Sequence, residues 1–377
     1  MYKIAFLDDG IMNGAENLPQ EVRKYVVNNG QISIRKEDES QYILSHGTMC
    51  FWIFAEYILN TDYILYDIQI LNEYTDKGNM EDLLQALQFC YDEKIDLINM
   101  SLGSTHFINE EGNSILEKLY NQGTYMVAAQ NNDNLVTYPA CTPYVFGVVR
   151  DYTQSLKVNE FCYVNDQSEK IDIISHCDFS AIELKHDIIM GKHNSFCAPY
   201  VSALIFNQLQ NGGKREDILY YFMKHSLPDN SFDKWKYKKR SFPVWKDMID
   251  VPVIDMRLSD KKPLDYLISL VEEFREDSFH AVGIWIGNKG TDDKAYLFQF
   301  PQREAPYEEQ ILKWVFNATD PDIIICGYDY ISNSNIIDLV DLTLTDQTSE
   351  EKKLSPTINV HKKSISQVVE SIGRYFG

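Results

Sequence analysis

The stretch Ile4-Ala5-Phe6-Leu7-Asp8-Asp9-Gly10 is a short apolar run that ends in two carboxylates and a glycine. Consecutive apolar residues bounded by a turn signal are typical of a buried strand, and Asp-Gly favours a turn. We therefore predict a strand over residues 3–7, followed by a turn at residues 8–10. Because a buried strand is a rigid support, Asp8 at its end is well placed to orient another side chain.

Two distant stretches supply side chains that such a carboxylate could orient. They are Ser45-His46-Gly47-Thr48 and Asn194-Ser195-Phe196-Cys197-Ala198-Pro199. A serine hydroxyl becomes a good nucleophile only when a base takes its proton and a carboxylate holds that base in the right tautomer. We therefore predict Ser195 as the nucleophile, His46 as the general base and acid, and Asp8 as the orienting carboxylate. Taken alone, Asp8 would more often be a turn residue, His46 a capped surface histidine and Ser195 a helix cap. Because all three occur in suitable local contexts and in the order Asp, His, Ser, catalysis is the favoured interpretation.

Apolar runs alternate with helical patterns through the first 225 residues. The predicted strands after residues 3–7 cover 63–70, 95–100, 124–129 and 144–149; the predicted helices start near residue 46 and then cover 79–93, 113–122, 195–210 and 215–225. Alternation of strands and helices is typical of a parallel sheet with helices on its faces. The sequence therefore predicts an α/β fold.

A chain of 377 residues is longer than one core usually supports, so we predict two domains. The first covers residues 1–227, and a proline-containing linker covers 228–262. Residues 263–377 are predicted to form a small α/β accessory domain that recognises the substrate or a partner. Its predicted elements are a helix at 264–275, strands at 280–286 and 294–300, a helix at 307–317 and a strand at 322–327.

Two segments of this second half have competing interpretations. The basic and aromatic run from Lys234 to Arg240 could bind nucleic acid or lipid, but a solvated linker against an acidic body is the favoured interpretation. The segment Ile286-Gly287-Asn288-Lys289-Gly290-Thr291 superficially suggests a phosphate loop. It lacks the spacing of that motif, and we predict a hairpin turn there instead.

The net charge of −21 argues against nucleic-acid binding and against attraction to anionic membranes. The seven cysteines form no C-x-x-C pair and no spacing typical of a metal site. Scattered cysteines suit reduced thiols in the cytosol. The first residues show no signal-peptide pattern, and no apolar run is long enough to span a membrane. We therefore expect a cytoplasmic protein.

The motifs resemble those of the subtilisin-like serine proteases, the subtilases, over about residues 1–225. Asp8-Asp9-Gly10 is similar to D-[ST]-G, and His46-Gly47-Thr48 to H-G-T-H. The segment 194–201 is similar to G-T-S-[MF]-A-[AS]-P-[HY]-V, and Val127-Ala128-Ala129-Gln130-Asn131 to V-x-A-A-G-N. The chain order Asp, His, Ser is the subtilisin order. The resemblance implies a serine endopeptidase that acts through an acyl-enzyme.

The resemblance also implies the residues around the scissile bond. Asn131 would donate its side-chain amide to the oxyanion, and Thr137 would lie near the floor of the specificity pocket. One wall of that pocket would be formed by Ser101, Leu102 and Gly103, and the other by Ala129 and Gln130. Four residues depart from the family pattern, namely Asp9, Met49, Gln130 and Asn194. None of these departures removes a predicted triad member or the oxyanion donor.

The position of Asp8 so early in the chain leaves no room for an inhibitory propeptide before it, and this favours narrow specificity in the cytosol. The expected activity is site-specific processing of a peptide or protein, such as leader removal from a ribosomally made precursor. A general intracellular turnover protease and an inactive binding protein on a subtilase fold remain the alternatives. Calcium often stabilises the family, but no D-x-D-x-D loop marks a site, so we expect no cofactor.

Overall fold

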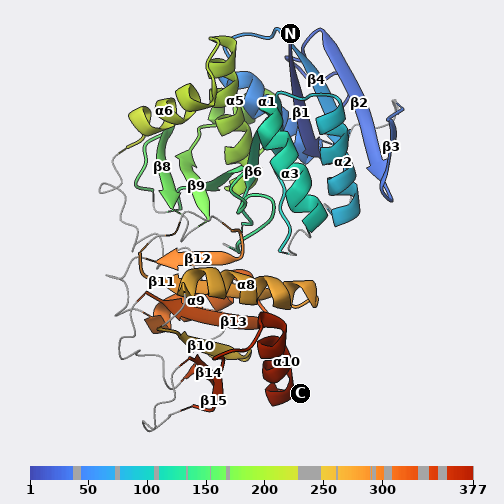
Figure 1. Cartoon of the computed structure of the whole chain (residues 1–377). Helices are drawn as coiled ribbons and strands as arrows, with labels where there is room; N and C mark the ends of the chain where they lie inside the picture. Colours follow the sequence, from blue (N-terminus) through green and yellow to red (C-terminus); the bar gives the residue numbers. More distant parts are fainter. Residues whose placement is uncertain are drawn as a thin grey trace. The chain divides into compact units, whose positions relative to one another are not determined.

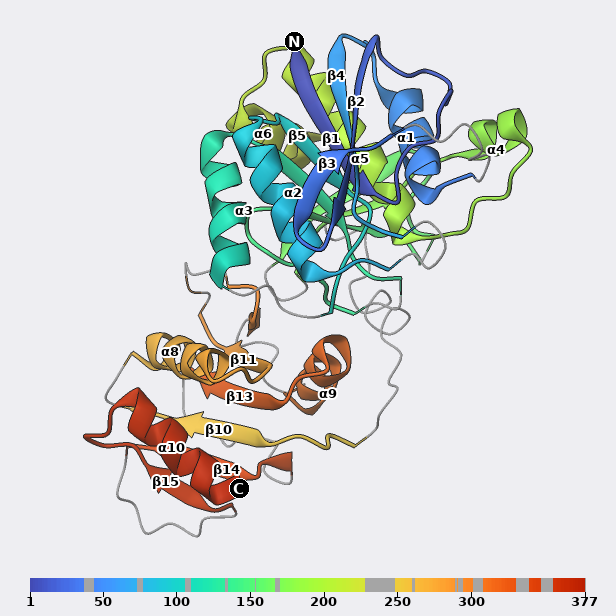
Figure 2. The same cartoon turned by 90° about the vertical axis from the view of Figure 1, so that its right-hand side faces the viewer.

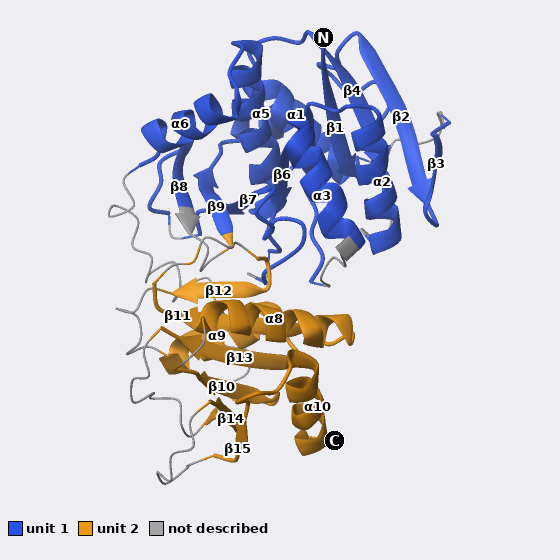
Figure 3. Cartoon of the chain, viewed as in Figure 1, with its two compact units in different colours: residues 1–166, 171–241 blue, residues 167–170, 242–377 orange. Residues whose placement is uncertain are grey.

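The computed structural model describes residues 1–36, 44–72, 77–105, 110–132, 135–152, 154–166, 170–227, 248–259, 262–288, 290, 294–300, 308–329, 339–346 and 355–376. The chain divides into two compact units (Figure 3). Unit 1 comprises Met1–Asp166 and Ile171–Ser241, and unit 2 comprises Gln167–Lys170 and Phe242–Gly377. Each unit contains its own sheet and its own buried core.

The sheet of unit 1 has nine strands in the order β3-β2-β4-β1-β5-β6-β7-β9-β8. All neighbouring pairs from β2 to β9 run parallel, and only the edge strands β3 and β8 pair antiparallel. The strands are β1 Tyr2–Asp8, β2 Glu21–Asn28, β3 Gln31–Ile34, β4 Tyr63–Gln69, β5 Leu97–Met100, β6 Tyr125–Ala129, β7 Phe146–Arg150, β8 Glu160–Asp166 and β9 Ile171–His176. The predicted parallel sheet is therefore confirmed.

Helices cover both faces of this sheet. Helices α2 and α3 lie on one face and α1 and α5 on the other, as the two views of Figures 1 and 2 show. The helices are α1 His46–Tyr57, α2 Met80–Asp92, α3 Glu110–Gln122, α4 Ser180–His186, the short 3-10 helix η1 Asn194–Phe196, α5 Cys197–Gln210 and α6 Arg215–His225. Burial of both faces explains why the central strands are apolar throughout rather than alternating.

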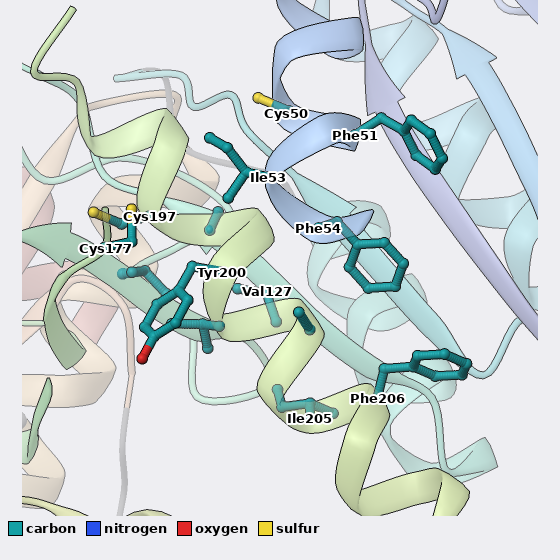
Figure 4. Close-up of a cluster of buried hydrophobic side chains, with 14 of the residues drawn as sticks. Cys50, Phe51, Ile53, Phe54, Val127, Cys177, Cys197, Tyr200, Ile205 and Phe206 are labelled. Carbon is teal, nitrogen blue, oxygen red and sulfur yellow. The ribbon is translucent and has the colours of Figure 1, made fainter. Parts of the chain in front are cut away.

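The core of unit 1 is centred on α5, which is buried around most of its circumference. Helix α1 packs against α5, and the rings of Phe54 and Phe206 lie with their centroids 5.8 Å apart (Figure 4). Phe54 also contacts Phe6 of β1, with the centroids 5.4 Å apart. A helix that is apolar on all sides is stable only inside a protein. The packing of α1 on α5 therefore holds His46, at the start of α1, and Ser195, in η1 directly before α5, close to each other.

Unit 2 contains a six-stranded sheet in the order β12-β11-β13-β10-β14-β15, in which all pairs run parallel. Helix α8 packs on β11 and β13, and α10 packs on α8. The elements are β10 Val253–Arg257, α8 Pro263–Glu276, β11 Ala281–Ile286, β12 Leu297–Phe300, α9 Glu308–Thr319, β13 Ile323–Tyr328, β14 Leu342–Thr345, β15 Thr357–Asn359 and α10 Ile365–Phe376. Unit 2 is thus also α/β.

Two predictions for the second half of the chain are wrong. The predicted linker 228–262 contains β10, a central strand of unit 2, because its apolar residues pair with β13 and β14 on either side. The predicted hairpin at 286–291 is excluded because the flanking strands β11 and β12 run parallel, and a hairpin joins antiparallel strands. Lys289 and Thr291 of that segment, and the whole run from Lys234 to Arg240, lie outside the described residues.

Within the part of the chain that the structure describes, no helix combines the length and apolar character needed to cross a membrane.

Candidate active site

The predicted site residues follow neighbouring parallel strands of unit 1. Asp8 ends β1, Ser101 follows β5, and Gln130 follows β6. These three strands are adjacent in the sheet, so their carboxyl ends meet at one edge. In open parallel sheets this edge is where functional sites form. The tertiary structure thus brings together residues that lie far apart in the sequence.

Asp8 and His46 form a hydrogen-bonded pair. The Nδ1 atom of His46 lies 2.9 Å from Oδ1 and 3.1 Å from Oδ2 of Asp8. Asp8 is 1 % exposed, and its Oδ1 also accepts a hydrogen bond from the backbone N–H of Asp9 at 2.9 Å. A buried carboxylate on Nδ1 favours the tautomer in which Nε2 is free to accept a proton.

Nε2 of His46 lies 2.9 Å from Oγ of Ser195. Ser195 belongs to η1, directly before α5, and is 8 % exposed. The His46 ring stacks on Phe196 with the centroids 5.2 Å apart, which limits rotation of the ring. The structure therefore joins the three predicted side chains in one chain of hydrogen bonds, Asp8 to His46 to Ser195.

The start of α1 is fixed by local capping. Ser45 caps the helix as predicted, because its side chain accepts from the N–H of Thr48 at 3.2 Å and donates to the carbonyl of Gly10 at 2.6 Å. Gly47 is required sterically, since a Cβ atom there would lie 2.8 Å from the Gly10 carbonyl oxygen. The small residue lets the helix approach the turn that carries Asp8.

Asp9 is a second buried carboxylate at this helix start. Its two oxygens accept from the backbone N–H groups of His46, at 2.9 Å, and Gly47, at 2.7 Å. Burial, followed by the charge of Asp8, raises the pKa of Asp9 to about 6. Asp9 therefore caps α1 in place of the small hydroxyl residue of the family pattern, and it does not face solvent.

The charge state of His46 reflects two opposing effects. Desolvation lowers the pKa of the ring, but the charge of Asp8, the interaction with Cys50 and the hydrogen bond to Asp8 together outweigh it. The net result is a pKa of His46 well above its ordinary value of 6.5. An imidazolium formed by taking a proton from Ser195 would therefore be stabilised.

Cys50 lies one turn of α1 beyond His46, and sequence reasoning did not single it out. Its Sγ lies 3.8 Å from Nδ1 and 3.9 Å from Nε2 of His46. Burial raises the pKa of the Cys50 thiol above its ordinary value of 9.0, so the thiol stays protonated near neutral pH. The sequence feature that could have identified Cys50 is its spacing of four residues from His46, which places both side chains on one helix face.

Among the described residues, Asp8, His46 and Cys50 form a group whose ligand atoms all lie within 4.8 Å of one another. One carboxylate, one imidazole and one thiol suit a soft metal ion rather than calcium, which takes oxygen ligands. Asp8 and Cys50 each already contact the His46 ring in the arrangement above. The expectation of no cofactor, with calcium left open, therefore stays a prediction.

The predicted pocket residues form a second cluster beside the first. Oε1 of Gln130 accepts from the N–H of Thr137 at 2.8 Å and from its hydroxyl at 3.0 Å, and the N–H of Asn131 donates to the Thr137 hydroxyl at 3.1 Å. A Cβ atom on Gly103 would lie 2.8 Å from Oγ1 of Thr137, so the two predicted walls are close together. Gly103 of one predicted wall and Gln130 of the other thus both contact Thr137, the predicted floor of the pocket.

The residues of the first wall have different surroundings. Ser101 is buried, and its hydroxyl accepts from the side-chain amide of Asn99 at 3.0 Å. Leu102 is half-buried and Gly103 is exposed. Ser104 and Tyr138 exchange two backbone hydrogen bonds of 2.8 Å, which tie this wall to the segment that carries Thr137. Ala129, at the end of β6 on the opposite wall, is buried.

The chain belongs to the subtilase family of serine proteases, because that family's profile matches residues 2–213, more than half of the 377 residues. No curated protein sequence matches the chain.

Solved structures of similar fold include three proteases. A lanthipeptide protease has 14 % identity and a TM-score of 0.42, covering 58 % of this chain and 78 % of its own. The prenylagaramide maturation protease PagA has 17 % identity and a TM-score of 0.39, covering 56 % and 78 %. The psychrophilic subtilisin-like protease Apa1 from the Antarctic Pseudoalteromonas sp. AS-11 has 21 % identity and a TM-score of 0.31, covering 40 % and 36 %.

Proposed function

We propose that the protein is a serine endopeptidase that cleaves peptide bonds through Asp8, His46 and Ser195. The observation that carries the proposal is the position of His46, whose two ring nitrogens each lie 2.9 Å from a partner, the Asp8 carboxylate and the Ser195 hydroxyl. A buried acid, a base and a hydroxyl in this arrangement have the parts needed for acyl transfer.

In the proposed reaction, Oγ of Ser195 attacks the carbonyl carbon of the scissile bond while its proton passes to Nε2 of His46. The carbonyl π electrons move to oxygen and form a tetrahedral oxyanion, which the side-chain amide of Asn131 stabilises. Collapse of this intermediate breaks the C–N bond, and His46 gives its proton to the leaving amine. Water then attacks the acyl ester with His46 as base, releasing the carboxylic acid and restoring Ser195.

Substrate selection is proposed to depend on the contact between Gln130, Thr137 and Gly103. The Thr137 hydroxyl lies 3.0 Å from Oε1 of Gln130 and 2.8 Å from the position that a Cβ atom on Gly103 would take. This packing supports a pocket that accepts only a small side chain. Narrow specificity suits cleavage at one site of a dedicated peptide, such as leader removal from a ribosomally made precursor.

The test of catalysis is covalent labelling of the full chain with a fluorophosphonate probe. We expect labelling of Ser195 that is abolished in Ser195→Ala and His46→Ala and retained in Ser180→Ala, a control serine at the start of α4. A folded wild-type protein that fails to label would instead support an inactive binding protein.

The test of specificity compares a series of peptides that differ at the residue before the cleaved bond with casein as a general substrate. We expect alanine, serine or glycine at that residue to be preferred over phenylalanine or leucine by at least about tenfold in kcat/KM, equivalent to about 1.4 kcal/mol. Rapid cleavage of casein at many sites would contradict the proposal of a dedicated substrate and would favour a turnover protease.

A further inference from the structure

We propose that Asn194 is a positioning residue that holds the oxyanion donor Asn131 in register with Ser195. This inference rests on the proposed function, because it concerns the stabilisation of the oxyanion in that reaction. Asn194 directly precedes the nucleophile and stands where the subtilase pattern has threonine. It is completely buried, so each of its polar atoms requires a partner inside the protein.

Two hydrogen bonds connect Asn194 to the segment that carries the oxyanion donor. Its Nδ2 donates to the backbone carbonyl of Asn131 at 2.8 Å. Its backbone N–H donates to Oδ1 of Asn132 at 2.7 Å. The residue next to the nucleophile therefore holds two consecutive residues of the oxyanion segment, one through its side chain and one through its main chain.

Two further hydrogen bonds determine which way the Asn194 amide faces. Its Oδ1 accepts from the N–H of Arg150, at the end of β7, at 2.8 Å, and from the hydroxyl of Tyr152 at 2.9 Å. The backbone N–H of Arg150 can only donate and the carbonyl of Asn131 can only accept, so the oxygen must face Arg150 and the NH2 group must face Asn131. The side chain is thus anchored to the sheet at one end and to the oxyanion segment at the other.

This arrangement bears on catalysis because oxyanion stabilisation depends on the position of the donor. A donor is effective only when it lies within hydrogen-bond distance of the developing charge, and misplacement by about 1 Å can cost roughly a hundredfold in rate. The hydrogen bond from Asn194 fixes the carbonyl of Asn131 and thereby restricts the backbone from which its side chain extends. A threonine has one hydroxyl on a shorter side chain and could not make the same three side-chain contacts with amide geometry.

The experiment is a double-mutant cycle between Asn194→Ala and Asn131→Ala in the full chain. It measures kcat and KM for a cleaved peptide and the rate of fluorophosphonate labelling. We expect Asn131→Ala to lower kcat by about a hundredfold or more, and Asn194→Ala to lower it by about tenfold or more with KM within about twofold. If Asn194 acts through Asn131, the double variant should be no slower than Asn131→Ala within about threefold.

Asn207→Ala is the matched control, because Asn207 of α5 also donates to a carbonyl, that of Tyr57, and accepts from the N–H of Leu59, both at 2.9 Å. We expect it to lower the melting temperature without lowering kcat. If Asn194→Ala does not fold, Asn194→Ser takes its place in the same cycle, since it removes the same amide donor.

Two outcomes would overturn the inference. One is a wild-type kcat in a folded Asn194 variant, whether or not KM rises. The other is multiplication of the two effects in the double variant. If the wild-type protein neither labels nor cleaves, the proposed function itself fails, and this result is distinguishable because it precedes any substitution.

Discussion

The residues around His46 combine burial with negative charge. Asp8 and Asp9 are both buried within hydrogen-bond distance of His46, one at its ring and one at its backbone N–H. The two carboxylates have different tasks, since Asp8 orients the ring and Asp9 caps the helix that carries it. Their different environments lead to two predictions at the scale of single residues.

The first concerns the pH dependence of activity. His46 must be neutral to take the proton of Ser195, and its pKa lies well above 6.5. We therefore expect kcat/KM to rise with pH through a midpoint above the ordinary histidine value of about 6.5. The measurement is a pH–rate profile with the melting temperature recorded at each pH. A midpoint at or below that value in a fully folded protein would contradict the raised pKa.

The second concerns the effect of Asp9 on stability. Its pKa is about 6 in the folded protein against 3.8 as the ordinary value, so the folded state holds the proton more tightly and loses stability as pH rises through about 6. The side chain of the Asp9→Asn variant cannot titrate. Between about pH 5.5 and 7.5, wild type should therefore lose roughly 1 kcal/mol of unfolding free energy relative to Asp9→Asn.

Chemical denaturation of both proteins at the two pH values measures this difference. If the unfolding free energy changed equally in wild type and Asp9→Asn, Asp9 would not titrate in this pH range in the folded protein. Both pH values lie above the isoelectric point of about 4.7, where the protein carries no net charge and solubility is lowest.

At the scale of secondary-structure elements, the decisive feature is the close approach of α1 to the turn after β1. A Cβ atom on Gly47 would lie 2.8 Å from the Gly10 carbonyl and 3.1 Å from Oδ1 of Asp9. We expect Gly47→Ala to move the helix start and lower kcat by about 10- to 100-fold, because His46 would leave its alignment with Asp8 and Ser195.

Gly373→Ala is the control for this substitution. Gly373 lies in α10, and among the described residues no atom other than its chain neighbours and its own helix backbone lies within 4 Å of its Cβ position. Alanine there should leave kcat unchanged and add up to about 1 kcal/mol of stability, since alanine favours helices over glycine. Equal activity of the two variants would show that the contact at Gly47 is not critical.

At the scale of the whole molecule, every proposed catalytic and pocket residue lies in unit 1, and unit 2 has a complete sheet and core of its own. Domains with separate cores generally fold separately. We expect a chain ending at Ser241 to react with the fluorophosphonate within about threefold of the full-length rate. We also expect it to lose kcat/KM on the natural precursor if unit 2 recognises the substrate.

The rate of fluorophosphonate labelling and kcat/KM are both measured on the truncated and the full-length protein. Loss of labelling in a folded truncated chain would show that unit 2 is needed to form the site. If the truncated chain kept the full-length kcat/KM on a precursor, unit 2 would not be needed for substrate recognition.

Prediction from sequence succeeded for features that depend on residues close together in the chain. The apolar run before Asp8 forms β1, Ser45 caps α1, and the parallel strands β4, β5, β6 and β7 were found from short apolar runs. Strands β2 and β3 were missed because partial exposure mixes polar and apolar residues in them. Strands β8 and β9, at the other end of the sheet, were also missed. Strand β10 was assigned to a linker because prolines surround it and its pairing partners lie far along the chain.

The sequence by itself determined the residue types of the site, their order and the elements that carry them, because capping, strand patterning and turn signals depend on neighbours in the chain. Only the tertiary structure decided how the side chains meet. The burial that raises the pKa of Asp9 and the four hydrogen bonds of Asn194 involve residues from different elements. Such contacts depend on packing in three dimensions, which no local pattern encodes.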